Sequence, residues 1–116
     1  MDLIVPTRLA GVALITLGIY YVVSWWGYWT VSYKGKLLTG GPYSMVRHPY
    51  YLGFLLLVTG LVVIAPLIET AGLAILSWTV IITHTKGEEE ELIKKYGKQY
   101  KEYMERVRWR LIPGVY

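Results

Sequence analysis

Two short segments of the sequence carry the residue types from which a site for a small charged molecule can be built. The first is residues 40–53, in which two glycines and two prolines bracket an Arg47-His48 pair. Arg47 can hold a carboxylate through two parallel hydrogen bonds. Pro49 suits the first turn of a helix, and the free N–H groups at such a helix start favour an anion. The segment is typical of a carboxylate site, and the alternative is that these residues only mark a membrane interface.

The second segment is a run of four glutamates, residues 88–91, directly after an apolar stretch. Carboxylates at this place could bind a cationic group such as an amine or a sulfonium. The alternative is a helix start whose acidic residues complement the helix dipole and pair with Lys94 and Lys95. If both segments lie at one membrane face, together they favour a zwitterionic ligand that resembles an amino acid.

Tyrosines gather around both segments, and their rings could stack on an aromatic base or hold a sulfonium by cation–π attraction. Several of them are equally expected as anchors at the membrane interface. The tyrosines concerned are Tyr43, Tyr50, Tyr51, Tyr96, Tyr100 and Tyr103.

The composition indicates that these segments belong to a membrane protein. Of the 116 residues, 54% are hydrophobic and only 17% are charged, whereas a soluble domain of this size needs a larger polar surface. The basic residues flank apolar runs and do not cover one face, so no nucleic-acid partner is expected. The absence of cysteine excludes disulfides, thiolate metal ligands and a cysteine nucleophile, and we expect no metal site.

We expect an all-α, polytopic membrane protein, a single domain over residues 1–116 with three transmembrane helices. The apolar stretches are about residues 9–30, 51–65 and 70–85, and a spanning helix needs about 20 residues. The second and third stretches are short and are expected to form a hairpin that turns near Pro66, with a re-entrant pair as the alternative. A cleaved signal peptide is disfavoured for the first stretch, because it is too long and ends in tryptophans.

A C-terminal amphipathic helix is expected over about residues 87–108, on the cytoplasmic side. Its apolar residues recur at steps of three and four, which places them on one face, and Gly97 interrupts the pattern. These residues are Leu92, Tyr96, Tyr100, Tyr103 and Val107. The basic residues concentrate in the loop 31–50 and after residue 85, so we expect both in the cytoplasm and the N-terminus outside.

The motif residues resemble a known family. The run Gly41-Pro42-Tyr43, followed by Arg47-His48-Pro49-x-Tyr51-Leu52-Gly53, is similar to the signature of isoprenylcysteine carboxyl methyltransferases and phospholipid methyltransferases. The similarity continues downstream and covers about residues 38–113, roughly two thirds of the chain. Its downstream matches are Glu88-Glu89, Tyr96-Gly97, Tyr100, Tyr103, Val107 and Ile112-Pro113.

The resemblance implies an integral membrane methyltransferase that uses S-adenosylmethionine and releases S-adenosylhomocysteine. It implies cofactor contacts from Tyr43, Arg47, His48, Tyr51, Gly53, Glu88 and Glu89, among which Arg47, His48 and Glu89 are the expected catalytic residues. Glu88 and Glu89 are chosen within the glutamate run by their distance from Gly97. The family usually has more helices before the motif, so either the first span replaces several of them or a second subunit completes the pocket as a homo-oligomer.

The expected acceptor is lipophilic and reaches the site from the membrane lipids. A carboxylate acceptor, such as isoprenylcysteine, is favoured over a phospholipid amine, because a carboxylate needs no general base. The alternatives are a non-catalytic small membrane protein or a degenerate relative with a structural role. A small multidrug transporter is disfavoured, because no ionisable residue lies inside a span to couple ions.

Overall fold

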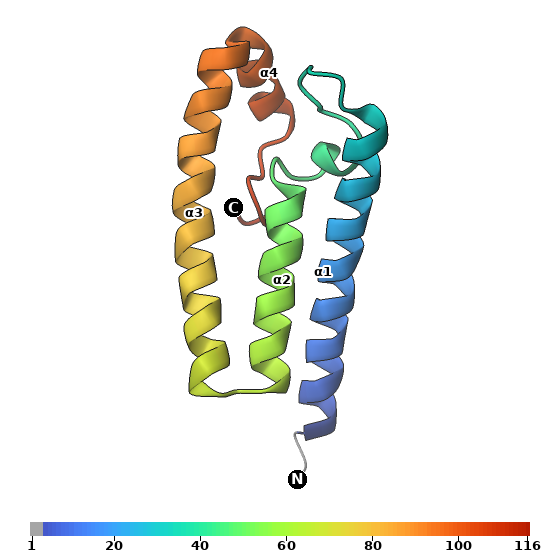
Figure 1. Ribbon diagram of the computed structural model, residues 1–116, viewed down its shortest axis with the longest axis vertical. Helices are drawn as coiled ribbons and strands as arrows, with labels where there is room; N and C mark the ends of the chain where they lie inside the picture. Colours follow the sequence, from blue (N-terminus) through green and yellow to red (C-terminus); the bar gives the residue numbers. More distant parts are fainter. Residues whose placement is uncertain (1–3) are drawn as a thin grey trace.

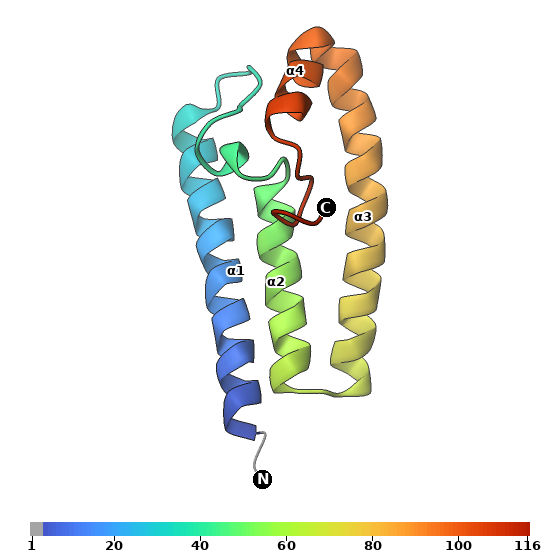
Figure 2. The same cartoon turned by 180° about the vertical axis from the view of Figure 1, so that it is seen from behind.

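Helices make up the computed structural model, which describes residues 4–116 (Figure 1). They are α1 (Ile4–Ser32), the 3₁₀ helix η1 (Gly41–Ser44), α2 (Pro49–Ile64), α3 (Ile68–Tyr96) and α4 (Lys98–Arg106). No strand occurs within this range, so the all-α prediction is confirmed. The three long helices stand side by side with neighbours antiparallel, and α4 lies over the end at which α1 finishes and α2 begins (Figures 1 and 2).

Two of these helices are long and apolar enough to cross a membrane, namely α1 and α3, each of 29 residues. Helix α2 is equally apolar in character but has only 16 residues. Large hydrophobic side chains are exposed along α1 and α3, for example Leu9 at 65% and Ile75 at 68%. Such an apolar exterior is what lipid accepts and water does not. The N-terminus is expected on the outside of the membrane. Its residues 1–3 lie beyond the part of the chain that the structure describes.

Helices α1 and α2 approach each other closely through two pairs of glycines. A Cβ atom on Gly18 would lie 2.6 Å from the carbonyl oxygen of Gly53, and one on Gly53 would lie 2.8 Å from that of Gly18. Gly11 and Gly60 form the same reciprocal contact, with a Cβ on Gly60 2.8 Å from the Gly11 oxygen. Small residues let the backbones of neighbouring membrane helices approach in this way. The pairing fixes the register of α2 against α1.

The expected hairpin between the second and third apolar stretches is present as a tight turn between α2 and α3. The Oγ1 atom of Thr70 caps the start of α3, because it accepts a hydrogen bond of 3.0 Å from the N–H of Leu67. Farther along the pair, the indole of Trp78 donates a hydrogen bond of 3.0 Å to Thr59 Oγ1 and links the two helices. The hairpin therefore returns the chain to the end at which α2 began.

The predicted boundaries of the C-terminal helix, about residues 87–108, are wrong. Helix α3 continues without a break through the glutamates to Tyr96, and Gly97, at φ +57°, separates it from α4. The glutamate run does not start a new helix because its backbone N–H groups are already paired within α3. Within α4, Tyr100 and Tyr103 are each only 1% exposed.

After α4 the chain turns back along α2. Leu111 is fully buried and packs with Leu55 of α2 and Ile81 of α3. The backbone N–H groups of Arg47 and His48 donate hydrogen bonds to the carbonyls of Trp109 and Arg110, at 2.9 and 3.1 Å. Figure 2 shows this final segment lying beside the first half of α2. The Arg-His pair and the end of the described chain are thus joined directly.

Candidate functional site

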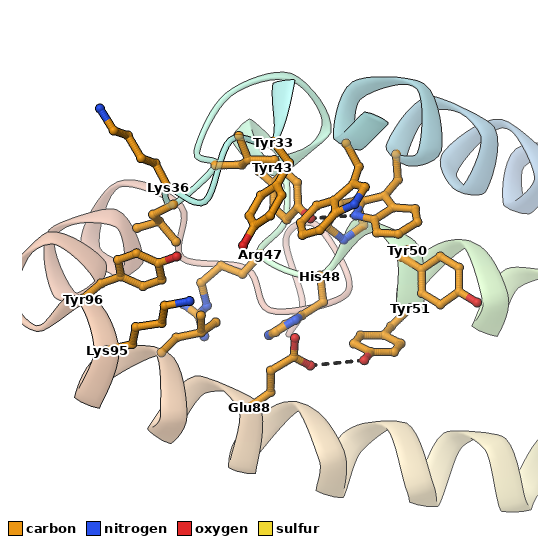
Figure 3. A pocket seen from close by; sticks show the side chains of 16 residues that line it. Tyr33, Lys36, Tyr43, Arg47, His48, Tyr50, Tyr51, Glu88, Lys95 and Tyr96 are labelled. Carbon is orange, nitrogen blue, oxygen red and sulfur yellow. Dashed lines mark hydrogen bonds between the residues drawn. The ribbon is translucent and has the colours of Figure 1, made fainter. Parts of the chain in front are cut away.

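A pocket of about 270 Å³ opens where the end of α1, the loop after it, the start of α2 and the 88–96 region of α3 meet (Figure 3). Aromatic and aliphatic side chains line most of its wall, with charged groups at a few points. The charged lining residues are Lys36, Arg47, Glu88 and Lys95, together with His48. A mainly apolar pocket with a few convergent polar groups is the usual form of a small-molecule site.

One wall of the pocket is a ladder of aromatic rings on α1. The ring of Trp25 stacks on Trp29 with centroids 5.7 Å apart, and Trp29 stacks on Tyr33 at 4.0 Å. Tyr50 of α2 extends the ladder, 4.8 Å from Trp25. The sequence alone identifies these tryptophans only as the end of the first apolar stretch. Their spacing of four residues, which places them on one helix face, was the signal that could have assigned them to a site.

Tyr43 is held between α1 and α4. Its hydroxyl accepts a hydrogen bond of 2.6 Å from the indole of Trp25. Its backbone carbonyl accepts another, also of 2.6 Å, from the hydroxyl of Tyr103. Burial raises the pKa of the Tyr43 hydroxyl, although the Trp25 hydrogen bond opposes this. The phenol therefore stays neutral and presents its ring to the pocket.

Glu88 is the carboxylate that faces the pocket, and it lies beyond the apolar part of α3. Its side chain is 38% exposed and points toward His48 and Tyr51 in Figure 3. The hydroxyl of Tyr51 donates a hydrogen bond of 3.1 Å to its Oε2 atom. His84, one turn earlier on α3, lies 3.4 Å from the same oxygen. Glu88 retains unshared oxygen surface that a ligand cation can approach.

The next residue, Glu89, has a different environment, because successive helix positions point about 100° apart. It is 3% exposed and is surrounded by donors. Arg47 forms a two-point contact with it, Nε to Oε2 at 2.9 Å and Nη2 to Oε1 at 3.2 Å. His48 Nε2 lies 2.9 Å from Oε2, and Arg110 Nη2 lies 2.9 Å from Oε1. Glu89 is the anchor that holds these three side chains together.

These contacts decide the protonation state of Glu89. Burial alone would raise the pKa of this carboxyl, but hydrogen bonds from His48, Arg110 and Arg47 outweigh it and lower the pKa from 4.5 to about 2. Hydrogen bonds and positive charges around a carboxylate both favour its ionised form. The carboxylate is therefore ionised at every physiological pH.

The Arg47 guanidinium makes two further hydrogen bonds, so that four of its five N–H groups have protein partners. Its Nη1 atom donates to the carbonyls of Val107 and Arg108, at 3.2 and 3.3 Å. Arg47 is 9% exposed and His48 5%, yet both contribute surface to the pocket. They form its inner end in a fixed orientation.

The structure brings together most, but not all, of the predicted site residues. Those that line the pocket are Tyr43, Arg47, His48, Tyr51 and Glu88, joined by Tyr50 and Tyr96. Glu89 lies behind the pocket wall, and Gly53 packs against α1. Tyr100 and Tyr103 are in the core between α4 and the loop. The residues that sequence reasoning missed are Trp25, Trp29 and Arg110.

Comparison with known proteins identifies the family of this chain. The family model of phospholipid methyltransferases matches residues 6–99. The chain belongs to this family. It is 37% identical over 81 residues to a protein-S-isoprenylcysteine O-methyltransferase of Dictyostelium discoideum, covering 69% of this chain and 34% of that protein. It is also 37% identical over 73 residues to protein-S-isoprenylcysteine O-methyltransferase B of Arabidopsis thaliana, covering 62% of this chain and 37% of that protein.

A second group of relatives has a different name. The chain is 35% identical over 88 residues to a Delta(14)-sterol reductase of Mus musculus, covering 70% of this chain and 20% of the relative. The chain thus spans little more than a third, or less, of the length of these curated relatives. No solved structure matches it.

Proposed function

We propose that this chain is a membrane-embedded methyltransferase that transfers a methyl group from S-adenosylmethionine to a lipophilic acceptor. The observation that carries the proposal is the pocket, which joins the Arg47-His48 motif to Glu88 at one end of the helix bundle, in a chain whose family is that of phospholipid methyltransferases. The pocket adjoins both the apolar helix surfaces and the charged end of the molecule. A polar donor and an apolar acceptor can therefore enter from different phases.

The residues around the pocket fit this donor. The aromatic ladder of Trp25 and Trp29 offers faces on which an adenine ring can stack. Glu88 offers a negative charge to a sulfonium or an amino group, and aromatic faces beside it attract the same cation. At the inner end, Arg47 has one Nη2 N–H beyond its contacts with Glu89 and with two backbone carbonyls, and this group can donate to a carboxylate. These three chemistries are those of a nucleoside joined to a charged amino acid.

Methyl transfer from a sulfonium is a direct displacement at carbon, in which the bound donor supplies the electrophilic methyl group. The protein need not form a covalent intermediate. Alignment of the two reactants can contribute up to about 7–11 kcal/mol to lowering the barrier. In this role the Glu89 anchor fixes Arg47 and His48, while Tyr43 and Tyr51 fix the pocket walls. Walls held by buried hydrogen bonds do not have to reorganise when the reaction occurs.

The membrane arrangement that we propose has three spans. Helix α2 joins α1 and α3 as the third, although about 24 Å of helix is short for a hydrocarbon core of about 30 Å. The glycine contacts that hold it against the longer α1 support this arrangement. We infer that α4, as an amphipathic helix, the loop 31–50 and the charged end of α3 face the cytoplasm, with the N-terminus outside, because basic residues concentrate there.

For the acceptor, we favour a lipophilic carboxylate such as isoprenylcysteine over a phospholipid amine. A carboxylate can attack the methyl group without losing a proton. An amine would require a base. His48 is already engaged with Glu89, which leaves Glu88, a carboxylate that also accepts from Tyr51, as the remaining candidate. The names of the isoprenylcysteine O-methyltransferases among the relatives favour the same acceptor class.

The alternatives are a non-catalytic relative with a structural role and a chain that acts only as a homo-oligomer. A reductase is a further candidate, because sterol reductases match over 70% of this chain. A reductase must draw on a hydride donor such as a nicotinamide nucleotide. Ligand binding distinguishes these candidates.

The test is calorimetry on the purified protein in detergent, with S-adenosylhomocysteine and NADPH titrated separately. We expect S-adenosylhomocysteine to bind and NADPH not to bind. The His48→Ala variant should have a lower affinity for S-adenosylhomocysteine. Binding of NADPH alone would favour a reductase, and the absence of both at millimolar ligand would favour the non-catalytic alternative. Mass determination in detergent, with and without ligand, decides whether binding needs more than one copy.

A further inference from the structure

Arg110 lies just outside the pocket and links the site to the end of the described chain. On one side its Nε atom donates a hydrogen bond of 3.0 Å to Glu89 Oε1, and its Nη2 atom lies 2.9 Å from the same oxygen in an ion pair. On the other side its Nη1 atom donates a hydrogen bond of 2.6 Å to the hydroxyl of Tyr116. The guanidinium also lies 5.2 Å from the centroid of the Tyr116 ring. The guanidinium is therefore held by Glu89 on one side and by Tyr116 on the other, with 20% of the side chain exposed.

The backbone of the same segment makes the connection continuous. The N–H of Arg110 donates to the carbonyl of Tyr116 at 2.6 Å, and the Arg110 carbonyl accepts from the N–H of His48 at 3.1 Å. The neighbouring Trp109 carbonyl accepts from the N–H of Arg47 at 2.9 Å. Residues 107–116, which we call the strap, therefore contact both the backbone and the side chain of Arg47.

Arg47 and His48 need such support because no regular structure holds them. They lie between the end of η1 at Ser44 and the start of α2 at Pro49, so no helical hydrogen bond fixes their backbone N–H groups. Only the His48 carbonyl takes part in α2, where it accepts a hydrogen bond of 3.0 Å from the N–H of Leu52. His48 is at the N-cap of α2, and its side chain makes no capping bond there. The side chains depend on Glu89, whose Oε1 atom is shared by Arg47 and Arg110. Arg110 thus restricts the carboxylate from the side opposite to the pocket.

We propose that Arg110 is a positioning residue for the pocket, that it acts through Glu89 on Arg47 and His48, and that Tyr116 holds Arg110 in place. Arg110 touches no pocket surface, so it acts on a ligand only through those residues. The relevance to the cofactor rests on the proposed function. The positioning itself is a statement about the protein without ligand and can be tested separately.

The experiment compares Arg110→Ala and Arg110→Lys with a matched control, Arg108→Ala. The Arg108 side chain is exposed, carries the same charge and lies two residues away. Hydrogen exchange measured by mass spectrometry on the ligand-free protein in detergent reports the backbone around Arg47 and His48. Calorimetry with S-adenosylhomocysteine reports the pocket, and thermal unfolding reports global stability.

We expect Arg110→Ala to speed the exchange of the Arg47 and His48 amides at least tenfold, with little change in α1 or in the α2–α3 turn. The affinity for S-adenosylhomocysteine is expected to fall about 10- to 100-fold, the usual effect of removing a residue that orients a binding group without touching the ligand. Arg110→Lys should restore part of both effects, and Arg108→Ala should change neither. Unchanged exchange at 47–48 in Arg110→Ala, or an equal rise in every peptide, overturns the proposal.

Tyr116→Phe tests the second link and serves as the deciding variant if Arg110→Ala does not fold. It removes one hydroxyl and keeps the ring. In the parent protein, Tyr116→Phe should speed exchange at Arg47 and His48 several-fold. In the Arg110→Lys variant, adding Tyr116→Phe should cause no further increase, because both residues act through one contact. Additive effects would show that Tyr116 acts by packing and would overturn this link.

The two readouts also separate the two proposals. If the parent protein binds no S-adenosylhomocysteine, the proposed function fails, while the exchange data still decide whether the strap positions Arg47 and His48. If the ligand binds but Arg110→Ala alters neither exchange nor affinity, the function stands and the strap has no positioning role.

Discussion

The guanidinium of Arg47 and the carboxylate of Glu89 meet in a two-point contact at 2.9 and 3.2 Å, although 42 positions separate them in the chain. Arg47 belongs to the segment before α2, and Glu89 lies near the end of α3. The α2–α3 hairpin lies between them in the sequence, so their contact joins the start of α2 to the end of α3 at the charged end of the bundle. The pocket lies directly beside this closure.

The first prediction is that Glu89→Gln destabilises the fold. The substitution leaves two arginines near the position without a buried counter-charge, and loss of one partner of a buried ion pair costs about 3–5 kcal/mol. The free energy of unfolding in mixed micelles measures the effect. Glu90→Gln is the control, because Glu90 is exposed on the same helix, and it should change stability by less than about 0.5 kcal/mol. Equal effects of the two variants would contradict the anchor role.

The second prediction concerns pH. The pKa of Glu89 is lowered from 4.5 to about 2 in the folded protein, so its ionisation stabilises the fold fully above about pH 4.5, and this contribution is lost as the pH falls toward 2. The stability difference between the parent protein and Glu89→Gln should be constant from pH 8 to 5 and shrink below pH 4.5. A difference that shrinks near neutral pH would show that Glu89 is not held ionised.

The third prediction is that Glu88→Gln affects the ligand and not the fold. Glu88 is half-exposed and faces the pocket, so its charge can act on the positive sulfonium. The affinity for S-adenosylmethionine should fall about tenfold, the affinity for the uncharged thioether S-adenosylhomocysteine should fall less, and the unfolding temperature should stay the same. Equal losses for the two ligands would place the sulfonium away from Glu88.

The fourth prediction uses two neighbouring tryptophans. Trp25 lines the pocket, whereas Trp26 points outward and is 61% exposed. Stacking of a base on an aromatic ring contributes about 1–3 kcal/mol, so Trp25→Leu should lower the affinity for S-adenosylhomocysteine at least several-fold. Trp26→Leu should leave the affinity unchanged in calorimetry. If Trp26→Leu has the larger effect, the aromatic ladder does not form the ligand wall.

The fifth prediction concerns the contact of α1 with α2. A methyl group on Gly53 would meet backbone and side-chain atoms of α1 at 2.8 Å, so Gly53→Ala should destabilise the protein by about 1–3 kcal/mol. Gly72→Ala on α3 is the matched control, since nothing lies within 4 Å of its Cβ position. It should be neutral or stabilising by up to about 1 kcal/mol. A stability loss from Gly72→Ala as large as that from Gly53→Ala would contradict the packing.

The helical class and the apolar stretches could be predicted from sequence because lipid-facing helices need long apolar runs. The end of α3 could not, because the change from apolar to acidic composition after Thr85 suggests a boundary while the backbone continues as helix to Tyr96. Gly97 carried the correct signal, since the break occurs there at φ +57°.

The pocket residues that are near the motif in sequence, Arg47, His48 and Tyr51, could be predicted. The different positions of Glu88, which faces the pocket, and Glu89, which is buried behind it, could not be predicted. They depend on the rotation of α3 about its axis, which only packing determines. Arg110 carried no periodic signal, because it lies in an irregular segment where one arginine among several basic residues has no distinguishing neighbour. Its role follows only from the return of the chain onto α2.

Helix α3 is one unbroken rod of 29 residues, about 44 Å long, and it carries lipid-exposed residues near one end and Glu88 and Glu89 near the other. In a bilayer, the tilt of such a helix responds to the thickness of the hydrocarbon layer. A change of tilt would displace the carboxylates of Glu88 and Glu89, because they lie far along the helix from the residues that face the lipid. We therefore expect the thickness of the membrane to act on the geometry of the pocket.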